Sequence, residues 1–129
     1  MRSSKAIFAF TIAAGLAMFA AGADAAGKKD KEVLKLYTQA MDEDYLNVEF
    51  DKAESKLKKA VDTCKKEADA CSPEVLAQLY VGLATVHGVG QQKLDVAKSD
   101  LVAALKADKD VSLIDGLTTP ELETKFKEA

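Results

Sequence analysis

The sequence contains no tryptophan, a single histidine (His87), two prolines and two cysteines. The scarcity of proline and the abundance of alanine, leucine, lysine and glutamate favour helices over the whole chain. A structural zinc ion takes about four ligands, and one histidine with two cysteines is a poor set for it. We therefore expect an all-α protein that holds no metal and no cofactor.

The chain also lacks an excess of positive charge, because its formal net charge is −3. A nucleic-acid partner would require a clustered basic face. The lysines at 58, 59, 65 and 66 are instead interleaved with acidic residues, which is typical of a solvated helix face. We therefore expect no nucleic-acid partner.

The first 25 residues have the order of a secretory signal peptide. Arg2 and Lys5 precede an uncharged run at 6–23, and Ala23 and Ala25 supply the small residues of a cleavage site. We predict cleavage after Ala25, with cleavage after Ala23 as a close alternative, which leaves one domain at 26–129, periplasmic or secreted, with no membrane span. An uncleaved anchor is the alternative, since the run just reaches the spanning length of about 18 residues.

Cys64 and Cys71 are the only cysteines, and in an oxidising compartment such a pair forms a disulfide by default. A continuous helix would separate their Cα atoms by about 10 Å, beyond the roughly 4.4–6.8 Å that a disulfide spans. Ser72 as N-cap and Pro73 as first helical residue predict a new helix there. Residues 65–70 can then turn back, although two free thiols remain an alternative.

Five helices are expected from the spacing of apolar residues. The first covers about 30–47, and the second opens at Asp51, with Glu54 at capping-box spacing. The third begins at Pro73 and ends at Gly88 to Gly90, where glycine can adopt positive φ. The fourth covers about 92–108, residues 109–118 form an extended arm, and Thr119 with Pro120 begins the last helix.

Segments 51–61 and 95–105 share the pattern D-x-A-x-S-x-L-x-x-A-apolar, offset by 44, and Leu36-Tyr37 matches Leu79-Tyr80 at an offset of 43. The repeated unit is therefore a helix pair, with small residues that allow close approach of the partner helix. The expected packing residues are Ala53, Leu57, Ala60, Gly82, Ala97, Leu101 and Ala104.

This pattern, with Phe50 before Ala53 and Gly82 in the preceding helix, resembles the tetratricopeptide repeat (TPR), and most of all the short exported TPR-like proteins of Gram-negative bacteria. The resemblance implies two antiparallel hairpins (about 31–66 and 73–108) stacked as a short solenoid, then the arm (109–118) and a closing helix (119–129). A plain helical bundle is the alternative.

The resemblance also implies a non-catalytic adaptor or scaffold of the cell envelope, which binds a protein or peptide on the first helices of the two pairs. The candidate partner-binding residues are Lys35, Gln39, Asp42, Gln78, Val81 and Thr85. The alternative is a structural subunit that self-associates as a homo-oligomer, through Leu122 and Phe126 or the first helix. His87 has no acid or nucleophile near it in sequence, so we expect it to contact carbonyl groups at a helix end, and we expect no enzyme.

Overall fold

The computed structural model describes residues 27–129, so the signal peptide predicted for 1–25 and its cleavage site lie outside the described residues. Within residues 27–129 the regular structure is helical, with no strand, and the all-α class is confirmed. The elements are α2 (Asp30–Thr38), continued by the π-helical segment η1 (Gln39–Asp44), then α3 (Phe50–Lys65), α4 (Pro73–Thr85), continued by the π-helical segment η2 (Val86–Gly90), α5 (Leu94–Ala107) and α6 (Pro120–Glu128).

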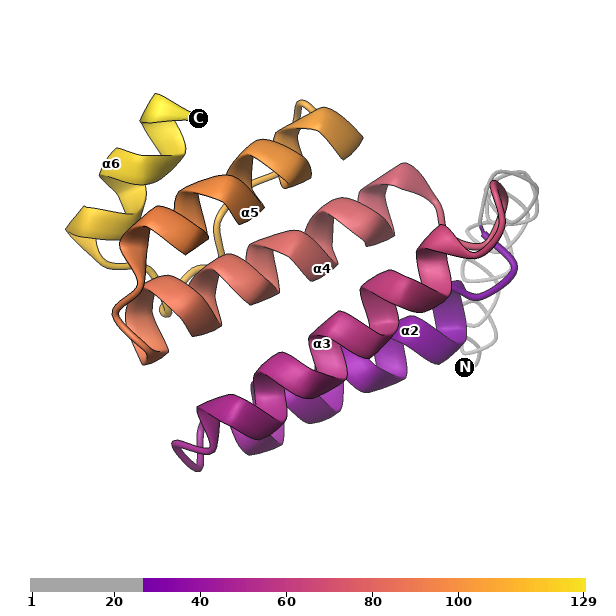
Figure 1. Cartoon of the computed structure of the whole chain (residues 1–129), viewed down its shortest axis with the longest axis horizontal. Coiled ribbons are helices and arrows are strands. Elements are labelled where there is room, and N and C mark those ends of the chain that lie inside the picture. The colour runs from indigo at the N-terminus through magenta and orange to yellow at the C-terminus, as the bar shows by residue number, and fades with distance from the viewer. Residues whose placement is uncertain (1–26) are drawn as a thin grey trace, which may run out of the picture.

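Each long helix packs against the next one in the chain, and α2 also contacts α4 (Figure 1). The buried side chains form two clusters. One gathers around Val33, Leu57 and Leu79, and the other around Leu101 and Leu122. Because α4 contributes residues to both clusters, it is the central helix of the domain. Helix α6 lies against α5 at the C-terminal end of the array.

The two helix pairs turn in the same way. Val48 and Gln92, which are 44 residues apart, have φ values of 62° and 58°. The residues that follow them, Glu49 and Lys93, are the N-caps of α3 and α5, with φ, ψ of −95°, 65° and −106°, 75°. Both N–H groups close the turn by donating to the preceding helix: Glu49 N to Asp44 O at 2.8 Å, and Lys93 N to His87 O at 2.6 Å. The internal repeat in the sequence is therefore also a repeat of backbone conformation.

Two expectations about helix ends are wrong. Helix α3 begins at Phe50 and has no side-chain cap, so Asp51 and Glu54 are not a capping box. Among the glycines of residues 27–129 only Gly116 has a positive φ, of 84°, and the helix continues through Gly88 and Gly90. These two glycines are required by close packing instead: a Cβ on Gly90 would lie 2.7 Å from the Phe50 ring, and one on Gly88 would lie 3.0 Å from the Ala97 Cβ.

The predicted starts of α4 and α6 are confirmed. The Ser72 hydroxyl accepts a hydrogen bond from Val75 N at 3.3 Å, and the Thr119 hydroxyl accepts one from Leu122 N at 3.2 Å. Proline follows each cap as the first helical residue, where its missing N–H removes no helical hydrogen bond. The same local chemistry therefore opens both helices.

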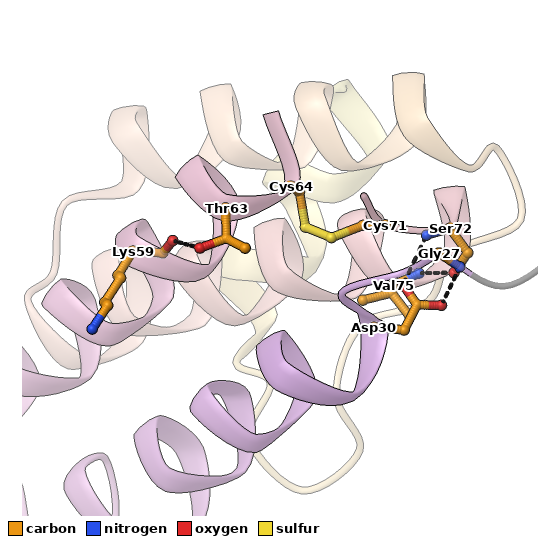
Figure 2. Close-up of a disulfide and its surroundings, with 8 residues drawn as sticks. All are labelled: Gly27, Asp30, Lys59, Thr63, Cys64, Cys71, Ser72 and Val75. Atoms are coloured by element: carbon orange, nitrogen blue, oxygen red, sulfur yellow. Dashed lines mark hydrogen bonds between the residues drawn. A yellow bond between two sulfur atoms is a disulfide. The ribbon is translucent and has the colours of Figure 1, made fainter. Parts of the chain in front are cut away.

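The predicted disulfide is also confirmed, since Cys64 and Cys71 are bonded, with their Cα atoms 5.1 Å apart (Figure 2). The start of α2 is joined to this turn by the Asp30 carboxylate. It accepts hydrogen bonds from Ser72 N at 2.8 Å and from Gly27 N at 2.9 Å. A Cβ on Gly27 would lie 2.3 Å from the Cys71 Cα, so only glycine fits there. The disulfide turn therefore holds both hairpins at one end.

Residues 109–118, which we call the arm, contain no helix and lead from the end of α5 back to α6 (Figure 1). Val111 and Leu113 pack against the Leu101 cluster, Leu117 packs against the Leu57 cluster, and Ile114 packs against both. The arm therefore crosses the junction of the two hairpins.

Candidate functional site

The predicted partner-binding residues do not all reach the surface. Lys35, Asp42 and Gln78 are exposed, and Gln39 is half-buried. Three of these four lie on α2 and its continuation η1, and Gln78 lies on α4. These four residues keep the accessibility that a binding role requires.

Tyr37 connects the two first helices. Burial raises the pKa of the Tyr37 phenol; a hydrogen bond with the Gln78 side chain lowers that pKa and the nearby Asp42 carboxylate raises it. The Tyr37 ring also faces Gly82 of α4, where an added Cβ would lie 3.0 Å from Tyr37 Cε1. The Tyr37 side chain therefore lies close to both Asp42 and Gln78.

Val81 and Thr85 were expected to be exposed on the same face, and this expectation is wrong. Each is only 1% exposed, and the Thr85 hydroxyl donates a hydrogen bond to the Val81 carbonyl at 2.9 Å. Val81 belongs to the cluster against which Val111, Leu113 and Ile114 of the arm pack. The pattern of α4 alone gives no sign that a later segment returns over it.

The repeat-packing residues are all buried. The six side chains on α3 and α5 have no exposed surface: Ala53, Leu57, Ala60, Ala97, Leu101 and Ala104. Gly82 is buried as well, and a Cβ there would lie 3.4 Å from both terminal methyl groups of Leu57. A small residue on α4 thus faces a large one on α3, which is the close approach expected from the pattern.

We had expected His87 to contact carbonyl groups at a helix end, and this is wrong. Its side chain is buried, with 4% of the residue exposed, and it bridges two helices. Its Nδ1 lies 2.6 Å from Asp100 Oδ2 on α5, and its Nε2 lies 3.0 Å from Glu54 Oε2 on α3. With both ring nitrogens engaged, His87 joins the second helix of one hairpin to the second helix of the other.

Two further side chains extend this group. Lys58 Nζ lies 2.8 Å from Glu54 Oε2, and Gln91 Nε2 donates to Glu54 Oε1 and to Asp51 Oδ1, each at 3.1 Å. We call the five residues His87, Glu54, Asp100, Lys58 and Gln91 the polar centre. The side chains of Asp51 and Glu54 therefore bond to residues of η2 and its C-cap rather than to the first turn of α3.

The charged groups of the polar centre shift one another's pKa values. The hydrogen bond to Asp100 raises the pKa of His87 above its usual 6.5, burial opposes this rise, and Glu54 adds to it. Lys58, followed by His87, lowers the pKa of Glu54 to about 2. Burial raises the pKa of Asp100, and the His87 ring opposes that change. A protonated His87 with Lys58 balances the two carboxylates, whereas a neutral His87 leaves one negative charge in excess.

The sequence contained a sign of this group that our reasoning missed. Asp44 is buried and forms an ion pair with Lys56 at 2.7 Å. Asp44 lies 43 residues before His87, and Lys56 lies 44 residues before Asp100, which are the two offsets of the internal repeat. Comparing charged residues at these offsets would have paired His87 with Asp100.

Within residues 27–129 no group of three or more histidine, cysteine, aspartate or glutamate residues is placed to hold a metal ion. In the same range no helix is long and apolar enough to cross a membrane.

Comparison of the chain with protein-family models, with curated proteins and with solved structures finds no significant match in any of the three. The functional assignment therefore depends on the residues and contacts described above.

Proposed function

We propose that this chain is an exported, TPR-like protein–protein interaction module of the bacterial cell envelope, a non-catalytic adaptor or scaffold. Its binding surface is the exposed side of α2 and η1 together with Gln78 of α4. The partner is a protein or peptide. The proposal includes a cleaved signal peptide and a periplasmic or secreted location.

The observation that carries this proposal is the matched turn of the two hairpins. Val48 and Gln92 share an uncommon backbone conformation at the sequence offset of the repeat, and positive φ is rare for a β-branched residue such as valine. Two units that agree in sequence pattern, turn and close packing support a stacked-repeat architecture. Proteins built in this way typically bind partners on an extended surface.

The polar centre supports the non-catalytic part of the proposal. His87 is the residue best suited to acid–base chemistry by its ordinary pKa, yet it is buried and both its nitrogens contact carboxylates. The two cysteines are joined to each other, so neither is a free thiol. These groups have a structural use that accounts for them.

Affinity isolation with a surface variant tests the proposal. The oxidised protein is immobilised and exposed to envelope extract, beside a variant with Lys35→Glu, Asp42→Lys and Gln78→Glu. Asp62→Lys, on the exposed side of α3, is the matched control. We expect a partner that is retained by the wild type and by the control and lost from the triple variant. Equal retention by all three proteins contradicts the assigned surface.

Self-association as a structural subunit is the second candidate, because Leu46 and Val48 are 61% and 70% exposed at the tip of the first hairpin. Self-association through α6 is less suitable than the sequence had suggested, since Leu122 is fully buried and Phe126 is half-buried. Light scattering at increasing concentration distinguishes the two candidates. A stable oligomer that Leu46→Ser and Val48→Ser dissociate favours the structural subunit.

A further inference from the structure

We propose that the arm is an intramolecular occupant of a peptide-binding groove on α4, and that the partner is an extended peptide with the same pattern of branched apolar residues, which displaces it. This inference rests on the proposed function and adds the chemistry of the partner and the means by which its access is controlled.

The first argument is the position of the arm. The face of α4 that the sequence predicted to bind a partner includes Val81 and Thr85, and both are buried. The arm side chains Val111, Leu113 and Ile114 pack against the cluster that contains Val81. A segment of the chain itself therefore lies over part of the predicted binding face, while Gln78, three residues before Val81 on the same helix, stays exposed.

The second argument is the way in which the arm is held. Its backbone hydrogen bonds are local, from Val111 N to Asp108 O at 3.1 Å and from Leu117 N to Ile114 O at 3.2 Å. Among residues 27–129 no backbone hydrogen bond joins the arm to α2 or α4. Its apolar side chains are all half-buried, and none is fully buried. A competing peptide can reproduce these apolar side-chain contacts, because it has no backbone hydrogen bonds to α2 or α4 to replace.

The third argument is the open space on the other side of the arm. An open hollow of about 560 Å³ separates it from α6 and is lined by Leu113, Gly116 and Phe126, among others. The helix ends on both sides are packed, because Leu122 of α6 is fully buried and Ala107, the last residue of α5, packs against the Leu101 cluster. The arm can therefore dissociate from α4 while α5 and α6 keep their positions.

The arm itself defines the chemistry of the partner. Its sequence Val111-Ser-Leu113-Ile114-Asp-Gly-Leu117 places branched apolar residues at positions 1, 3, 4 and 7, with polar residues or glycine between them. Ser112, Asp115 and Gly116 face solvent. A competing peptide needs branched apolar side chains at the same spacing, and the intervening positions can vary.

Gly116 allows a test that does not alter the groove. Its φ is 84°, and a Cβ there would meet no atom within 4 Å. Gly116→Val therefore disfavours the packed conformation of the arm through the backbone strain at this positive φ, and not through a steric clash. Ser112→Ala, at an exposed arm position, is the matched control. The probe is a fluorescent peptide of residues 109–118, and its control is the same peptide with serine in place of Ile114.

We expect the Gly116→Val protein to bind the probe at least about fivefold more tightly than wild type and Ser112→Ala, measured by fluorescence anisotropy. The serine-containing peptide should bind none of them. Equal affinity of all three proteins, or equal binding of the two peptides, overturns the inference. Circular dichroism confirms that the variant is folded.

Hydrogen exchange on the wild-type protein gives a second measurement that needs no variant. Arm amides should exchange through local opening, at a rate insensitive to low denaturant, while α4 amides stay protected. Exchange of arm and α4 amides in one global step contradicts a displaceable arm. A partner isolated as described above but retained equally by wild type and Gly116→Val leaves the proposed function standing and rejects the arm as its regulator.

Discussion

The Nδ1 atom of His87 lies 2.6 Å from Oδ2 of Asp100, and this pair occupies the position of Asp44 and Lys56 in the first hairpin, with the charges exchanged. In the first hairpin the acid is on the first helix and the base on the second, with 2.7 Å between them. In the second hairpin the base is on the first helix. Only the second pair contains a histidine, whose ordinary pKa lies near neutral, so mild changes of pH are expected to act on this pair and on its contact with Glu54 of the first hairpin.

Stability should fall as the pH rises above neutral. The pKa of His87 is raised above 6.5 in the folded protein by Asp100, so its contribution is fully present below pH 6.5 and is lost as the pH passes the folded pKa. Urea unfolding from pH 5.5 to 9 measures this. We expect the free energy of unfolding to decrease over that range in wild type and to stay nearly flat in His87→Gln, because the sequence has one histidine and both cysteines are in the disulfide.

At acid pH the two carboxylates should act in opposite directions. Glu54, whose pKa is about 2, contributes stability above its ordinary pKa of about 4.5 that is lost as the pH falls towards 2. The pKa of Asp100 is raised by burial, so protonation of this residue offsets part of that loss. Glu54→Gln should therefore weaken the acid-induced decrease in stability. An unchanged acid transition in that variant contradicts the role of Glu54.

Removing the His87 side chain should destabilise the fold at pH 6. His87→Ala leaves Glu54 and Asp100 without their common partner. Loss of one member of a buried pair costs about 3–5 kcal/mol, and we expect about 2–3 kcal/mol because both carboxylates retain some contact with water. Asp62→Ala, on the exposed side of α3, should change stability by less than about 0.5 kcal/mol. Urea unfolding at pH 6 compares the two, and equal values contradict a structural bridge.

The sequence predicted local features well because they depend on local chemistry. Ser72 with Pro73 and Thr119 with Pro120 set the starts of α4 and α6 through caps that involve only three or four neighbouring residues. The disulfide followed from the same reasoning, since the helix start at Pro73 required a turn after Cys64.

The errors have the opposite origin, because they concern contacts between segments distant in sequence. Val81 is buried in a cluster formed with α5 residues, against which the arm packs some 30 residues later in the chain. His87 meets Glu54 across 33 residues, and helix periodicity contains no information about such a contact. Gly88 and Gly90 were read as turn glycines, whereas the Ala97 and Phe50 side chains packed against them decide their identity.

Removal of the disulfide should loosen the joint between the hairpins. Closure of an eight-residue loop by Cys64 and Cys71 corresponds to about 2.5 kcal/mol on the chain-entropy model. We expect Cys64→Ser to lower the melting temperature by several degrees, and reductant to lower that of wild type by a similar amount. Reductant should leave the melting temperature of the serine variant unchanged. Equal melting temperatures of oxidised wild type and Cys64→Ser contradict the role of the disulfide.

Truncation of the two equivalent leucines should be costly. Leu57 and Leu101 are both fully buried, one in each cluster, and each change to alanine should cost about 2–5 kcal/mol. Leu46→Ala is the matched control, since this side chain is 61% exposed and should change stability by less than about 0.5 kcal/mol. Denaturant unfolding of the three variants measures the difference. A neutral result at either buried leucine contradicts the alignment of the two repeats at that position.

Relief of the backbone strain at Val48 should stabilise the protein. Val48 has a φ of 62°, a conformation that asparagine tolerates far better than a β-branched residue does. Its side chain is 70% exposed, so the substitution removes little packing. We expect Val48→Asn to raise the free energy of unfolding by about 0.5–1 kcal/mol. Val96→Asn is the control for the loss of an exposed valine, since Val96 is 42% exposed within α5, and it should be neutral or slightly destabilising. Equal effects of the two substitutions in thermal and urea unfolding would show that the turn at Val48 is not strained.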